Sequence, residues 1–201
     1  MNLRELSEQL GLSQTTVSRA LNGYPEVSEA TRTMVLAAAE ANGYHPDARA
    51  RSLATGRAKA IGHVNPQSTS HEMVNVVFAD FIAGAGETYG NHGYDLVMSM
   101  VSDDAEEQAY RTLARKRNVD GVIVHAPTQN DPRIDLLREL KLPFVVHGRS
   151  SAVTSDYSWL DVNNTRAIER AAEFLIDLGH RRIALVNGVE RMDFALRRRD
   201  G

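Results

Sequence analysis

The chain has 201 residues, 42% of them hydrophobic, which is enough for one large core or two smaller ones. It contains no cysteine, so disulfides and thiolate metal sites are excluded, and no apolar run is long enough to cross a bilayer. The net charge of −3 does not by itself favour a nucleic-acid partner. Residues 1–59, however, carry seven Lys and Arg against six Asp and Glu, so the placement of the cations matters more than their number.

The first 46 residues predict three short helices. Each expected helix follows a side chain that can cap a helix N-terminus, namely Asn2, Ser13 or Ser28, and each has apolar residues three and four positions apart. A glycine ends the first and the third of them. The predicted helices cover Leu3–Leu10, Ser13–Asn22 and Glu29–Asn42.

The first two predicted helices meet across Gly11, which is the pattern of a helix-turn-helix. The second helix carries short polar side chains and Arg19, which can reach base edges in the major groove of DNA. The pattern therefore favours sequence-specific DNA binding over a three-helix unit that serves packing alone.

A linker is predicted after the third helix. Asp47 can cap a helix over Ala48–Ala54, but two turns are too short to be stable in water without a partner. Residues 48–59 hold four cations and no acid. We expect this stretch to become ordered only when it docks on another surface.

From Ala60 onward, strand and helix patterns alternate, which predicts a doubly wound, mainly parallel α/β sheet with helices on both faces. Ligands of such sheets bind beyond the carboxyl ends of the strands, where Asn65, Ser99, His125–Pro127 and His147–Arg149 are expected. The predicted strands are Ile61–Asn65, Tyr94–Val101, Gly121–His125, Leu142–His147 and Arg182–Asn187, with an extended piece at Tyr157–Val162. The predicted helices are Val74–Gly90, Ala105–Arg117, Ile134–Leu140 and Thr165–Leu178.

Several runs, in chain order, resemble LacI/GalR-family transcriptional regulators. The resemblance implies a helix-turn-helix headpiece over residues 1–46, a hinge helix and linker over 47–59, and a periplasmic-binding-protein-like effector and dimerisation domain over 60–201. That domain would be truncated, with most of its second lobe missing. The runs are Ser13–Gly23, Val27–Arg32, Gly43–Pro46, Ala50–Leu53, Ile61–Gly62, Val119–Ile123 and Leu178–Ala184.

The family resemblance implies a homodimeric repressor that binds pseudopalindromic operator DNA. Gln14, Thr15 and Arg19 would read bases, which suits their chemistry, although each could instead contact phosphate only. Leu53 would wedge into a minor-groove step, or pack in an ordered linker. Contacts to the DNA backbone would come from Thr16, Ser18, Asn22, Arg49, Arg51 and Arg57.

The resemblance also implies a small-molecule effector, probably a carbohydrate. Arg149 could equally form a surface ion pair, and Phe78 could be a core residue. The sequence departs from the family at Asp47, Arg49 and Gly148, where relatives usually have Asn, an aliphatic residue and Asp. The expected effector residues are Phe78, His147, Arg149, Asp161 and Arg198.

Two other classes of protein remain open alternatives. One is a carbohydrate-binding module without a DNA role, and the other is a sugar-converting enzyme, for which no nucleophile–base constellation is evident. We expect no enzymatic activity, no cofactor, no metal site and no membrane partner. A regulator of this kind would be cytoplasmic and associated with the nucleoid.

Overall fold

The computed structural model describes residues 1–44, 55–67 and 76–201. The chain divides into two compact units, Met1–Ala58 and Lys59–Gly201. Within the described parts, no helix combines the length and apolar character needed to span a membrane. The hinge residues singled out in the sequence lie outside the described residues; they are Asp47, Arg49, Arg51 and Leu53.

Three helices form the first unit, as the sequence predicts: α1 (Leu3–Leu10), α2 (Gln14–Leu21) and α3 (Glu29–Ala41). The expected caps are confirmed. Asn2 forms a capping box with Glu5, in which the Asn2 side chain accepts from the Glu5 amide and the Glu5 carboxylate accepts from the Asn2 amide, both at 3.0 Å. The Ser13 and Ser28 hydroxyls cap α2 and α3.

The core of the first unit is small. Leu6 of α1 packs with Val17 and Ala20 of α2 and with Val35 and Ala39 of α3, and all five are buried. Since the inward face of α2 is fully used by this packing, its polar residues are left on the outside.

The second unit contains a five-stranded parallel sheet with the strand order β2-β1-β3-β4-β5. In this order β1 is central, which brings its end beside those of β3 and β4. His125 of β3 pairs in register with His147 of β4, and His147 pairs with Leu160 of β5. The strands are β1 (Ala60–Pro66), β2 (Asp95–Val101), β3 (Gly121–His125), β4 (Phe144–His147) and β5 (Trp159–Leu160).

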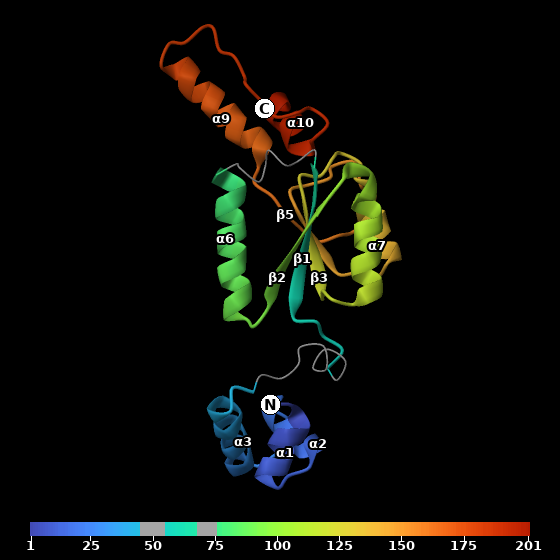
Figure 1. Cartoon of the computed structure of the whole chain (residues 1–201). Helices are drawn as coiled ribbons and strands as arrows, with labels where there is room; N and C mark the ends of the chain where they lie inside the picture. The colour runs from blue at the N-terminus through green and yellow to red at the C-terminus, as the bar shows by residue number, and fades with distance from the viewer. Residues whose placement is uncertain (45–54, 68–75) are drawn as a thin grey trace. The chain divides into compact units, whose positions relative to one another are not determined.

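Helices cover both faces of the sheet, as expected for a doubly wound fold. Helix α6 (Val76–Asn91) lies on one face, and α7 (Glu106–Lys116) lies on the other (Figure 1). Helix α8 (Pro132–Glu139) packs beside α7, where Arg111 and Glu139 form an ion pair at 3.3 Å. The predicted start of α6 at Val74 lies outside the described residues.

The strand predicted over Arg182–Asn187 is wrong, because these residues adopt no regular structure. Their apolar side chains favour a strand, but a strand also needs a neighbour to exchange backbone hydrogen bonds with. None of the described residues pairs with this segment, and Val186 is 97% exposed. The segment connects α9 (Asn164–Asp177) to α10 (Asp193–Asp200).

Candidate functional site

The outer face of α2 presents the residues expected to read bases. Gln14, Thr15 and Arg19 are exposed, while Val17 and Ala20 point into the core. Among the described residues, Arg19 forms no ion pair, so its guanidinium is available to a ligand. The N-terminal end of α2 is fixed by Ser13, whose hydroxyl accepts from the Thr16 amide at 3.1 Å.

Most of the polar residues of α2 surround one hollow of the first unit. Asn22 is held there by its side-chain amide, which donates to the Ser18 carbonyl at 2.8 Å. Thr16 lies apart, because its hydroxyl bonds to that of Ser13 at 2.8 Å, and Arg57 is exposed after the helices. The hollow is lined by Leu3, Gln14, Thr15, Ser18, Arg19, Asn22 and Tyr24.

A second hollow lies at the carboxyl ends of β1 and β3 in the second unit. Its lining includes Asn65 and Thr128 beside Glu106 and Arg133. Asn65 is only 5% exposed, and its side-chain nitrogen has no hydrogen-bond partner. A buried amide without a partner is costly, so this edge of the sheet is suited to a ligand with an acceptor oxygen.

Arg133 holds this edge of the sheet together. Its guanidinium contacts the carboxylates of Asp131 at 2.7 Å and Glu106 at 3.0 Å, and it donates to the His125 carbonyl at 3.0 Å. Burial raises the pKa of Asp131, but the hydrogen bonds and charge of Arg133 outweigh it and keep the pKa below its ordinary value. The group therefore remains an ion pair.

Three histidines meet between the sheet and α6. The Nδ1 atom of His63 lies 2.9 Å from Nε2 of His125, and Nδ1 of His125 lies 3.2 Å from Nδ1 of His147. The hydroxyl of Tyr89 lies 3.3 Å from Nε2 of His63. Phe81 of α6 stacks on the His147 ring, with centroids 4.4 Å apart.

Burial keeps these three imidazoles neutral at physiological pH. It lowers the pKa of His63 from 6.5 to about 4, and together with the neighbouring His63, His147 and Arg133 it lowers the pKa of His125 to about 3. Burial also lowers the pKa of His147, although the carboxylate of Asp161 opposes that shift. The cluster therefore acts through hydrogen bonds rather than through charge.

The expected effector residues fall into three local groups. Phe78 meets the His125 ring edge-on at 5.2 Å, which links it to His147. Arg149 lies over the ring of Trp159, 4.7 Å from its centroid, and forms no ion pair among the described residues. Asp161 and Arg198 both bond to the side chain of Asn164, at 3.1 Å and 2.8 Å.

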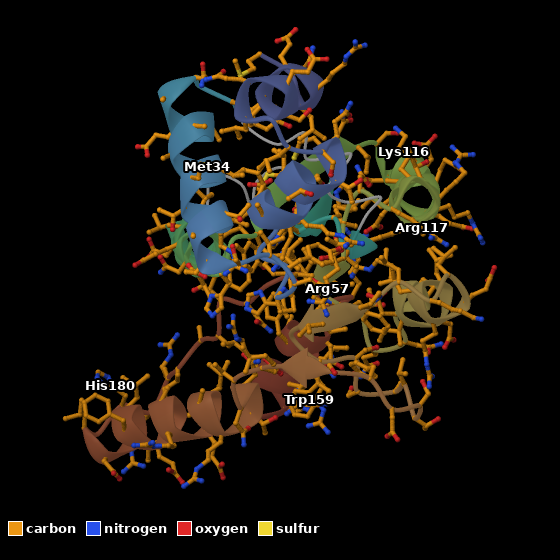
Figure 2. All side chains as sticks on the ribbon, turned by 90° about the horizontal axis from the view of Figure 1, so that it is seen from below. Met34, Arg57, Lys116, Arg117, Trp159 and His180 are labelled. Carbon is orange, nitrogen blue, oxygen red and sulfur yellow. The ribbon has the colours of Figure 1, made fainter. Side chains whose placement is uncertain are left out.

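The sequence did not point to His63, Tyr89 or Asn164 as members of this region. His63 lies mid-strand and is 62 residues from His125, so only the sheet register brings them together. The seven histidines show no close spacing in the sequence, yet three of them touch in the fold. His180, by contrast, lies at the end of α9 remote from Trp159 (Figure 2).

Two protein families match successive parts of this chain. Residues 2–47 match "Bacterial regulatory proteins, lacI family". Residues 58–201 match "Periplasmic binding proteins and sugar binding domain of LacI family".

Similar proteins include two regulators whose whole sequences are longer than this chain. The HTH-type transcriptional regulator AglR of Rhizobium meliloti is 48% identical over 201 residues, which is 100% of this chain and 56% of AglR. The HTH-type transcriptional regulator RafR of Escherichia coli is 34% identical over 201 residues, or 59% of its length. The chain thus spans a little over half the length of these relatives.

Solved structures show the same architecture. The Lac repressor dimer bound to operator and an anti-inducer aligns with a TM-score of 0.80 and 25% identity, covering 98% of this chain and 59% of that one. The complex of the regulator CelR with cellobiose aligns with a TM-score of 0.64 and 28% identity, covering 100% and 59%. Since the two family matches run through nearly the whole sequence, this chain belongs to the LacI family of bacterial regulatory proteins.

Proposed function

We propose that this chain carries the DNA-reading part of a transcriptional repressor that binds a pseudopalindromic operator as a homodimer. The observation that carries the proposal is the exposure of Gln14, Thr15 and Arg19 around one hollow of α2. Gln can bond adenine with both ends of its amide, Arg can bond guanine, and the Thr methyl can meet a thymine methyl.

Phosphate contacts would position this helix in the groove. Ser18 and Asn22 line the same hollow, and Thr16 and Arg57 are the other described candidates. Arg49 and Arg51 would add cations, and Leu53 would enter the minor groove. These contacts would set affinity and its dependence on salt, whereas the base contacts would set the preferred sequence.

A small carbohydrate is the proposed effector. The related CelR was solved with cellobiose, and the second unit matches a family that includes sugar-binding domains. Phe78, His147, Arg149, Asp161 and Arg198 would provide an aromatic face and hydrogen-bonding groups for its hydroxyls. Such a regulator would act in the cytoplasm, on the nucleoid.

Selection from a library of duplexes with a randomised centre tests the proposal directly. The 201-residue chain should enrich sequences with two-fold symmetry, because a homodimer presents α2 twice. Cellobiose, maltose and sucrose should then be added in turn, and one class of sugar should change the affinity for the enriched duplex. Recovery of no preferred sequence would contradict the proposal. A carbohydrate-binding module without a DNA role would respond to the sugar alone.

A further inference from the structure

A continuous line of hydrogen-bonding groups runs from α6 to the ligand edge of the sheet. It starts at the Tyr89 hydroxyl, passes through the rings of His63 and His125, and ends at His147, with contacts of 3.3, 2.9 and 3.2 Å. His63 is 0% exposed and His125 is 7% exposed, so water does not supply their protons or acceptors. Each of these two rings uses both of its nitrogens in the line.

Counting protons limits how this line can be arranged. A neutral imidazole has one N–H, and each contact needs one donor and one acceptor. In one order the Tyr89 hydroxyl donates to Nε2 of His63, each histidine donates onward, and His147 retains its proton on Nε2. In the opposite order His147 donates from Nδ1, and its Nε2 is a bare acceptor. Any mixed order places two donors or two acceptors face to face.

Both ends of the line favour the first order. Burial raises the pKa of Tyr89, so the hydroxyl keeps its proton, and His63 is its partner among the described residues. At the other end, Asp161 follows Leu160, the register partner of His147, and its carboxylate favours a proton on His147. Arg133, the remaining charged group that bears on the cluster, opposes a positive charge on His125.

We propose that Tyr89, His63 and His125 form a proton-ordered relay that fixes His147 as the Nε2–H tautomer. His147 then presents a neutral hydrogen-bond donor to the effector, which must offer an acceptor oxygen at that point. The inference rests on the proposed effector role of His147, and it makes the other three side chains positioning residues. A metal is a poor alternative, since the nitrogens form a line and no cluster in the described residues is suited to a metal ion.

Nitrogen-15 NMR of the histidine side chains tests the relay in the 201-residue chain without any ligand. Protonated and bare ring nitrogens have different chemical shifts, and His147→Gln identifies the His147 signals by their loss. Wild-type His147 should show a protonated Nε2 and a bare Nδ1. A protonated Nδ1 would overturn the proposal.

Substitution of Tyr89 by Phe tests whether the relay sets the tautomer. The Phe ring retains the packing of Tyr89 but removes the first donor, so His147 should lose its single tautomer and show averaged shifts at both nitrogens. Tyr94→Phe is the matched control, because Tyr94 lies under the Lys59 ammonium, outside the relay, and the His147 signals should not change. Unchanged His147 signals in Tyr89→Phe would contradict the relay. Failure to find an operator or a sugar would count against the proposed function and would not alter these spectra.

Discussion

Gly148 sets the backbone between His147 and Arg149, two of the residues expected to contact the effector. Its φ of +114° lies in a region that favours glycine, and a Cβ atom there would lie 2.7 Å from Cδ of Pro127. Relatives that carry Asp at this position must arrange this turn differently. The glycine therefore determines how the two flanking side chains reach the edge of the sheet.

The Gly148→Ala substitution should lower the free energy of unfolding by at least about 2 kcal/mol, because backbone strain and the Pro127 contact add. Gly93→Ala is the matched control. Gly93 also has a positive φ, of +67°, but open space around its missing Cβ, so only the strain of roughly 1–2 kcal/mol applies. Urea unfolding followed by fluorescence of Trp159, the single tryptophan, measures both. Equal losses would contradict the proposed clash.

The headpiece and the effector edge differ in how far their residues could be predicted from sequence. Gln14, Thr15 and Arg19 were placed correctly on an exposed face because helix periodicity and a capping serine act over a few residues. The His63–His125 contact depends on strand register across 62 residues, which no local pattern encodes. The Arg182–Asn187 strand failed for a related reason, since a strand depends on a neighbour that local pattern does not supply.

At the scale of elements, Arg133 joins α8 to the start of α7 and to the end of β3. Replacement by Met should destabilise the second unit by about 3–5 kcal/mol, because Asp131, with a side chain 2% exposed, would be left as an unpaired buried charge. Arg111→Met provides the control. Its side chain is 38% exposed, so its pairs with Glu107 and Glu139 should contribute less than about 1 kcal/mol. Urea titrations of both variants would show similar losses if the Arg133 network were of no special importance.

The histidine line should make stability depend on pH. Folded His63, with a pKa of about 4, takes up no proton between pH 6.5 and 4, whereas the unfolded chain does. Stability is therefore greatest above pH 6.5 and declines as the pH falls toward 4, by up to about 1.4 kcal/mol per pH unit for this residue. Unfolding curves at pH 7 and pH 5 should show a smaller loss in His63→Gln than in the wild type. The exposed His92, changed to Gln, should leave the loss unaltered.

The whole molecule combines a small helical unit with a sheet unit, each with its own core. Three helices bury little area, so the free energy available to the first unit is modest. Its polar residues are nevertheless fixed, because the caps at Asn2 and Ser13 and the buried Val17 leave α2 one orientation within that unit. A rigid helix with an unpaired Arg19 is the feature on which base reading depends.

Affinity for the selected duplex and for a scrambled duplex of the same composition, measured by fluorescence anisotropy, tests this central claim most directly. Arg19→Ala should lose about 1–3 kcal/mol of discrimination, roughly ten- to a hundred-fold, because a bidentate base contact disappears. Arg4→Ala removes the same charge from α1, where Arg4 is exposed and paired with Glu8 at 2.8 Å, and should keep the discrimination. The account is contradicted if the wild-type chain binds both duplexes equally, or if the two variants discriminate alike.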